Sequence, residues 1–191
     1  AKAVSERLKE KRRFIQVILG PRQVGKTTAI QQILAESAIP SHYAAADFPA
    51  PPPQEWIGRQ WDLARLKVSE ARPAILVLDE VQKVSHWSIE VKRLWDEDTR
   101  QHRPIHVVLL GSSSLLIQKG LDESLAGRFE IVRFPHWSWQ ECRDCFGWPL
   151  ERYLYFGGYP GPAGLTEQEE RWGQYIRDSL IETAISKDIL L

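Results

Sequence analysis

The chain has 191 residues, a formal net charge of zero, 43% hydrophobic residues and 26% charged residues. This composition is ordinary for a soluble globular protein, and the neutral balance argues against a nucleic-acid-binding surface over the whole chain. No apolar run approaches the length of a membrane-spanning helix, and the polar start of the sequence lacks a hydrophobic signal region. We therefore expect a cytoplasmic protein without membrane contact.

The first two segments of the chain are a polar run and an apolar run. Residues 1–13 carry more Lys and Arg than Glu, which predicts a short solvated helix, with a basic nucleic-acid-binding arm as the alternative. Residues 14–19 are mostly apolar and predict a strand, and residues 26–36 place apolar side chains at helical spacing. The sequence thus predicts a strand and a helix joined by a short loop.

This loop carries a recognisable motif. It fits the pattern G-x-x-x-x-G-K-[ST], and its residues are Gly20, Pro21, Arg22, Gln23, Val24, Gly25, Lys26, Thr27 and Thr28. Gly20 and Gly25 have no Cβ atom, so the backbone can turn sharply there and approach a ligand closely. The N–H groups of the loop and the positive end of the following helix then favour phosphate. We expect the whole run to bind a nucleotide.

Three side chains at the end of the loop have separate predicted roles. Lys26 brings a mobile ammonium group to the β- and γ-phosphates, Thr27 offers a hydroxyl ligand to Mg²⁺, and Thr28 is next in line for the α-phosphate. A chance match in a glycine-containing turn is the alternative. The strand before the loop and the helix after it are the context that the motif requires, and they favour phosphate binding.

The chain then alternates between strand-like and helix-like segments. Strands are predicted at 42–46, 74–78, 105–110 and 130–134, and helical segments at 54–71, 85–101, 113–119 and 122–126. Apolar strands separated by helices are typical of a parallel sheet that is covered on both faces. The pattern predicts an α/β fold with a doubly wound five-stranded sheet over residues 1–135.

After residue 135 only helices are predicted, at 138–146, 150–156 and 167–187. We therefore expect residues 136–191 to form a helical lid or C-terminal extension. Cys142 and Cys145 lie within the first of these helices. A structural zinc site usually needs four ligands, and the sequence offers no complete set near these cysteines, so free thiols are expected. Most of the eight tryptophans fall on apolar stripes, which predicts packing rather than base stacking.

Two other strand ends carry polar side chains. Asp79 and Glu80 follow a buried strand about 50 residues after the lysine-threonine loop. At that position an aspartate can hold Mg²⁺ through water, and the next glutamate can orient and deprotonate an attacking water. Ser112 follows Gly111 at the end of strand 105–110, where its hydroxyl can bond the water or the γ-phosphate. Solvated turns are the alternative at both places.

The motifs GPRQVGKTT, ILVLDEVQ, LLGSSS, SLAGR and YFGGYP, in this order, resemble the bacterial and archaeal AAA-like P-loop ATPases over about residues 10–190. The resemblance implies a P-loop NTPase with sheet order 5-1-4-3-2, ATP and Mg²⁺ as ligands, and a glutamate-activated water. Matching positions are Lys26 and Thr27 in the first Walker motif, Asp79 and Glu80 in the second, Ser112 as sensor, and Arg128 in the family's Gly-Arg.

In that family an uncharacterised C-terminal domain of nuclease-like fold normally follows the AAA domain. The last helix and the apolar end of the sequence indicate an uncovered surface, so we expect a fragment that stops before such a domain. DNA contact would then be made by the missing domain. AAA-like modules commonly act as rings, which implies a homo-oligomer.

Arg128 has three interpretations. It would pair with Asp122 or Glu123 on the surface, reach its own γ-phosphate, or reach a neighbouring subunit's nucleotide as an arginine finger. We favour a nucleotide-facing role, slightly in trans.

The predicted function is an ATPase that acts as a motor or switch for an attached domain. A nucleotide kinase is less favoured, because Glu80 points to water as the acceptor. A GTPase is disfavoured, because guanine recognition in that class uses Asn-Lys-x-Asp and this chain has no Asn. A module that binds ATP and seldom hydrolyses it contains the same residues, so this alternative stays open.

Overall fold

The computed structural model describes residues 2–69, 72–111, 117 and 120–182. The chain divides into two compact units. The first contains Ala1–Leu19 with Lys26–Arg133, and the second contains Gly20–Gly25 with Phe134–Leu191.

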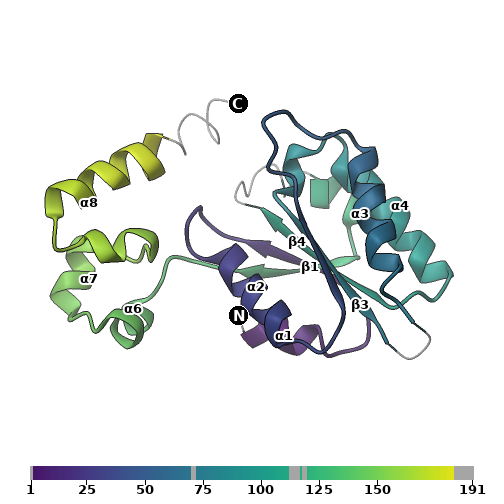
Figure 1. Cartoon of the computed structure of the whole chain (residues 1–191), viewed down its shortest axis with the longest axis horizontal. Coiled ribbons are helices and arrows are strands. Elements are labelled where there is room, and N and C mark those ends of the chain that lie inside the picture. Colours follow the sequence, from purple (N-terminus) through teal and green to yellow (C-terminus); the bar gives the residue numbers. More distant parts are fainter. Residues whose placement is uncertain (1, 70–71, 112–116, 118–119, 183–191) are drawn as a thin grey trace. The chain divides into compact units, whose positions relative to one another are not determined.

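The first unit is built on a parallel sheet, which Figure 1 shows as arrows. Its strands are β1 (Ile15–Leu19), β2 (Ser41–Ala45), β3 (Ala74–Asp79), β4 (Ile105–Gly111) and β5 (Phe129–Arg133). The order is β2-β3-β4-β1-β5, and every neighbouring pair is parallel. This is the predicted order 5-1-4-3-2 from the other edge, so the predicted P-loop NTPase fold class is confirmed.

Helices cover both faces of this sheet (Figure 1). Alternate side chains of β1, β3 and β4 form one core with α3 (Glu55–Arg65), α4 (Trp87–Arg100) and η2 (Leu121–Leu125). The intervening side chains face α1 (Lys2–Arg7) and α2 (Lys26–Glu36). For example, Arg7 of α1 donates a hydrogen bond to Gln16 Oε1 of β1 at 3.0 Å. The three central strands are buried throughout, because both of their faces are covered.

Two predicted helices differ from the observed ones. Helix α1 is not solvated on all sides, because Val4 and Leu8 lie four residues apart on one helical face and both are buried. The helix predicted at 54–71 ends at Arg65, and the backbone of Ser69 and Arg72 then pairs as an isolated bridge. The short helix predicted at 113–119 lies mostly outside the described residues.

A buried carboxylate joins α3 to α4. Asp98 of α4 is fully buried and accepts hydrogen bonds from Trp61 Nε1 at 2.6 Å and from Arg65 Nη2 at 2.7 Å. Arg103 Nη1 lies 3.3 Å from the same carboxylate. A buried charge requires such partners to offset its lost hydration, so this network holds the two helices in register.

The helical part of the second unit contains α6 (Trp139–Phe146), α7 (Leu150–Phe156), η3 (Gly161–Leu165), α8 (Glu169–Tyr175) and η4 (Ile176–Ile181). Ser138 and Glu141 form a capping box at the start of α6, and Gly147 ends this helix at a φ of 68°. Aromatic rings pack between these helices. The contacting pairs are Trp137–Phe146, Phe146–Trp148, Trp148–Phe156 and Phe156–Trp172.

Candidate functional site

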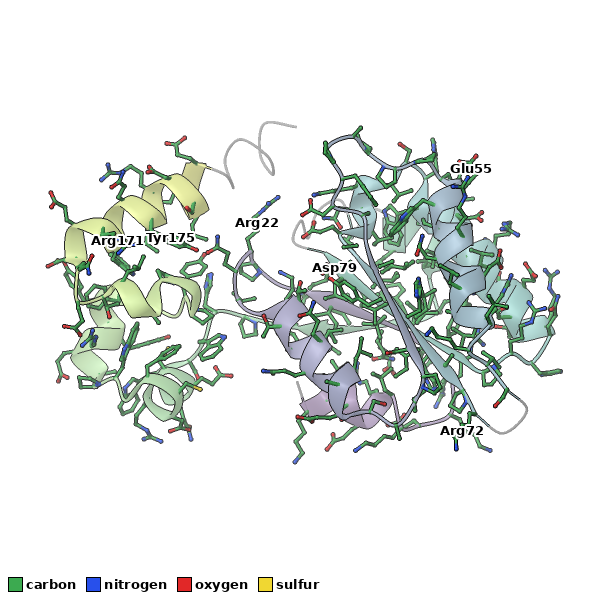
Figure 2. The ribbon with its side chains drawn as sticks, viewed as in Figure 1. Arg22, Glu55, Arg72, Asp79, Arg171 and Tyr175 are labelled. Carbon is green, nitrogen blue, oxygen red and sulfur yellow. The ribbon has the colours of Figure 1, made fainter. Side chains whose placement is uncertain are left out.

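The site begins where Thr27 meets Asp79. Asp79 is the last residue of β3 and belongs to the set of alternate side chains that face α2, and Thr27 lies in the first turn of α2. Thr27 Oγ1 donates a hydrogen bond to Asp79 Oδ2 at 2.8 Å, although the residues are 52 positions apart. Asp79 is only 6% exposed, and Figure 2 labels it at the end of its strand. The structure therefore brings these two predicted residues together.

Two further donors hold the Asp79 carboxylate. The Tyr43 hydroxyl donates to Oδ2 at 2.7 Å, and the backbone N–H of Glu80 donates to Oδ1 at 2.9 Å. Tyr43 lies on β2, whose residue Ala45 pairs with Asp79, so the tyrosine reaches the aspartate from the neighbouring strand. Burial and the hydrogen bond to Asp79 raise the pKa of Tyr43 far above its usual value. No sequence motif indicates this residue.

Glu80 is positioned by a second residue that no sequence motif indicates, Gln82. The backbone of Glu80 is left-handed, with a φ of 52°, and Gln82 Nε2 donates to the Oε2 atom of Glu80 at 2.5 Å. Gln82 belongs to η1 (Val81–Lys83), and its Oε1 atom is buried without a hydrogen-bond partner among the residues that the structure describes. A Cβ atom on Gly111 would come within 2.7 Å of this oxygen, so a larger residue at the end of β4 would displace the Gln82 side chain. Gln82 thus contacts both Glu80 and the end of β4.

The other predicted residues of this unit lie in different settings. Lys26 is the first residue of α2 and is 7% exposed. Thr28 is exposed on the same first turn. Ser112 lies outside the described residues, immediately after Gly111.

The glycine loop, residues 20–25, belongs to the second unit. Gln23 and Gly25 have positive φ values, 61° and 90°, so the loop turns sharply at two places. A Cβ atom on Gly20 would lie 2.0 Å from the backbone oxygen of Phe134, which excludes any larger residue there. The turn and the close approach explain why the motif contains glycine at both positions.

Two side chains from the helical part hold this loop. Trp137 Nε1 donates to the backbone oxygen of Val24 at 3.1 Å, and the Tyr175 hydroxyl donates to Gln23 Oε1 at 2.5 Å. Figure 2 labels Arg22 on the loop and Tyr175 on α8. The contacting residues are more than 100 positions apart, and no sequence motif indicates them.

The structure does not bring Arg128 to Asp79 and Glu80. Its guanidinium donates to both carboxylate oxygens of Asp96 on α4, at 2.8 and 3.0 Å, and lowers the pKa of Asp96. The backbone oxygen of Arg128 accepts from the N–H of Ile15 at 2.8 Å, at the amino end of β1. The length of β1, about 13 Å, therefore separates it from the edge where Asp79 ends its strand.

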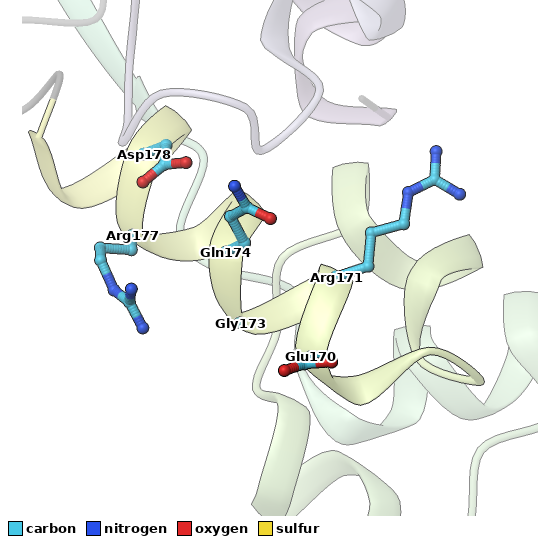
Figure 3. Close-up of a pocket in the computed structure, with 6 residues that line it drawn as sticks. All are labelled: Glu170, Arg171, Gly173, Gln174, Arg177 and Asp178. Atoms are coloured by element: carbon cyan, nitrogen blue, oxygen red, sulfur yellow. The ribbon is translucent and has the colours of Figure 1, made fainter.

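A separate surface depression of about 540 Å³ lies along α8 and η4. Its lining residues are Glu170, Arg171, Gly173, Gln174, Arg177 and Asp178. Figure 3 shows that the charged side chains spread away from one helical stretch and do not converge on a point. Two positive and two negative side chains also balance each other, so the depression offers no directed ligand chemistry.

The described residues offer a metal ion few protein ligands. Within the described part of the chain, no three His, Cys, Asp or Glu side chains gather as a metal cluster. Mg²⁺ does not need such a cluster, because it keeps several waters and binds through one or two protein oxygens with substrate phosphates. The pair of the half-buried Thr27 and the buried Asp79, joined by a hydrogen bond, fits that requirement. Of the cysteines, Cys142 is buried and Cys145 is exposed.

No helix among the described residues combines the length and apolar character that crossing a bilayer requires.

The sheet order, together with the glycine-loop sequence motif that follows β1, defines a P-loop NTPase. The model of the family described as "AAA domain" matches residues 12–143. The chain therefore belongs to this AAA-domain family, and it is a nucleotide-binding module of the AAA type.

Solved structures of other proteins resemble the chain. Cdc6p from Pyrobaculum aerophilum is 16% identical with a TM-score of 0.50, and the match covers 69% of this chain and 42% of that protein. A single-residue variant of RuvB from Thermotoga maritima is 20% identical with a TM-score of 0.49, over 75% of this chain and 44% of that protein. The chain thus spans less than half of either protein, and the first likeness concerns the fold alone. A comparison with curated proteins found no match.

Proposed function

We propose that this AAA module binds ATP with Mg²⁺ and hydrolyses the terminal phosphoanhydride bond. The observation that carries the proposal is the 2.8 Å hydrogen bond between Thr27 and Asp79. It joins the residue after the loop lysine to the acid that ends β3, and phosphoryl transfer in P-loop enzymes needs this pair on one Mg²⁺ ion. A solvated strand end would not bury Asp79 beneath three donors.

The first group of residues acts on the phosphates. Residues 20–28 provide backbone N–H groups and the positive end of α2, and the Lys26 ammonium neutralises charge on the β- and γ-phosphates. Thr28 lies next to Thr27 and serves the α-phosphate. Thr27 and Asp79 would hold Mg²⁺, which, when bound, withdraws negative charge from the phosphoryl group being transferred.

The second group acts on the attacking water. Glu80 would accept the proton of the water, and Gln82 supports this role because it fixes one carboxylate oxygen at 2.5 Å. Ser112 follows the end of β4 and would bond the water or the γ-phosphate. Arg128 remains a proposed arginine finger for a neighbouring subunit. It lies at the amino ends of the strands, whereas Asp79 and Glu80 of the same chain lie at the carboxyl ends.

The hydrolysis cycle would serve an attached domain as a motor or a switch. The resemblance to AAA-like ATPases with a nuclease-like C-terminal domain supports this part of the proposal, and DNA contact would then belong to that domain. Residues 136–191 would act as the helical extension that links the ATPase core to the attached domain. A homo-oligomer would bring Arg128 to a second nucleotide.

Steady-state phosphate release tests the proposal. The chain is mixed with ATP in Mg²⁺ or in EDTA, each with and without duplex DNA, and released phosphate is measured. We expect release only with Mg²⁺. Release at the level of a protein-free blank in all four mixtures, with ATP binding shown separately, would replace hydrolysis by the second candidate below.

The second candidate is a nucleotide-dependent binding switch with little turnover. One observation favours it: Gln82 Nε2 already occupies Oε2 of the Glu80 carboxylate, so this oxygen would not accept the proton of a water while the contact lasts. Such a module would bind ATP tightly and release phosphate slowly. The ratio of ATP affinity to turnover separates the two candidates.

A further inference from the structure

Asp79 Oδ2 accepts two side-chain hydrogen bonds, and they come from different parts of the first unit. Thr27 donates from α2 at 2.8 Å, and Tyr43 donates from β2 at 2.7 Å. The other oxygen, Oδ1, is held by the backbone N–H of Glu80 at 2.9 Å. The carboxylate therefore has no freedom to rotate while all three donors remain.

The two side-chain donors differ in what else they do. Thr27 is the residue that the proposed function assigns to Mg²⁺, so its hydroxyl serves two partners. Tyr43 has no such second role, and its strand is hydrogen-bonded to β3 with Ala45 opposite Asp79. Its hydroxyl donates to Asp79 Oδ2 at 2.7 Å, so Tyr43 acts on the carboxylate alone.

We propose that Tyr43 is a positioning residue that orients the Asp79 carboxylate for Mg²⁺ and thereby sets how strongly Mg²⁺ increases nucleotide affinity. This inference rests on the proposed function. Residues that hydrogen-bond a metal ligand fix its orientation, and their loss typically lowers metal affinity 10- to 100-fold. Without the tyrosine hydroxyl, Asp79 Oδ2 would keep only the donor that Mg²⁺ itself engages.

A purely structural role for Tyr43 makes a different prediction. Tyr43 is half-buried on the edge strand of the sheet, so it could simply cover neighbouring apolar groups. Loss of such packing would lower stability, and it would weaken nucleotide binding equally with and without Mg²⁺. The Mg²⁺ dependence of binding therefore separates positioning from packing.

The test uses Tyr43→Phe, which removes the hydroxyl and keeps the ring. ATP is titrated calorimetrically into the wild-type chain and the variant, once in Mg²⁺ and once in EDTA. We expect the variant to lose about 10-fold in affinity with Mg²⁺ and to match the wild type in EDTA. Tyr155→Phe is the matched control, because Tyr155 lies on α7 and is 62% exposed. It should match the wild type in both titrations.

A double-mutant cycle with Asp79→Asn shows whether Tyr43 acts through Asp79, because losses at coupled residues are not additive. Additive losses would overturn the inference. So would equal affinity of Tyr43→Phe and wild type with Mg²⁺, or an equal loss in Mg²⁺ and EDTA. A wild-type chain that binds no ATP in either buffer would overturn the proposed function, and this inference with it.

Discussion

The side-chain amide of Gln82 donates a hydrogen bond to the Glu80 carboxylate at 2.5 Å, and Glu80 itself has a left-handed backbone. A left-handed conformation costs a residue with a side chain about 1–2 kcal/mol. A simple strand end needs neither the strain nor the partner. Both features fit a glutamate whose carboxylate must occupy a defined position, and this is the residue that we propose as the general base.

Glu80→Gln should keep ATP affinity and hydrolyse ATP at least ~10²-fold more slowly, because glutamine cannot accept the proton of the attacking water. Phosphate release under saturating MgATP measures the loss, and calorimetry measures the affinity. Glu55→Gln is the matched control, because Glu55 is an exposed glutamate at the start of α3. Unaltered turnover in Glu80→Gln would show that Glu80 does not activate water.

Trp137→Phe should weaken ATP binding about 5-fold, because the Val24 carbonyl loses a hydrogen bond worth about 1 kcal/mol. The phenyl ring still packs on Phe146, whose centroid lies 5.5 Å from that of Trp137. Trp139→Phe is the control: it loses a 3.3 Å bond to the Trp148 oxygen, away from the loop. Equal effects of the two substitutions would mean that the helical part merely lost stability.

Asp98→Ala should destabilise the first unit by about 3 kcal/mol, because it leaves the Trp61 N–H and the Arg65 guanidinium without their buried acceptor. Urea unfolding followed by circular dichroism gives the change. Asp62 is another partner of Arg65, and its side chain is 69% exposed. Asp62→Ala should therefore lower the free energy of unfolding by less than about 1 kcal/mol. Similar losses in both variants would contradict the structural role of Asp98.

Arg128→Ala should lower turnover ~10³-fold or more with ATP binding intact if Arg128 serves a neighbouring subunit as an arginine finger. Asp96→Asn is the control, because it removes the ion pair and keeps the arginine. A structural role would make the two variants similar, whereas a finger makes only Arg128→Ala inactive.

Mixing then tests action in trans. Arg128→Ala and Lys26→Ala chains, each inactive alone, are combined, and a trans finger should restore part of the activity. The intact loop of one chain would use the intact arginine of the other. No recovery in an assembly shown to be mixed would leave Arg128 with its structural pairing to Asp96 alone.

The strands were predictable because their sequences carry local signals, whereas the family resemblance supplied their order. Residues 14–19 are mostly apolar and residues 74–78 are a continuous apolar run, as expected for buried parallel strands. Every predicted strand end lies within one residue of the observed end. Helix ends were less accurate, since the bridge between Ser69 and Arg72 shortens the helix predicted to reach residue 71.

The supporting side chains of the site were not predictable. Tyr43 and Trp137 reach their partners only through strand register and chain folding, and no spacing in the sequence encodes either contact. Arg128 is a case in which a motif was present but did not predict the observed contact. Its motif points to the nucleotide, but the structure pairs it with Asp96, a residue that no local pattern connects to it.

The most direct test of the account is a calorimetric titration of MgATP into the wild-type chain and Lys26→Ala. The lysine supplies charge-assisted bonds worth about 1.5–3 kcal/mol each, so its loss should weaken binding about 10- to 100-fold or more. Lys67→Ala, which removes an exposed lysine beyond α3, should bind as the wild type does. Equal ATP affinity in wild type and Lys26→Ala would contradict the assignment of residues 20–28 as the nucleotide-binding loop.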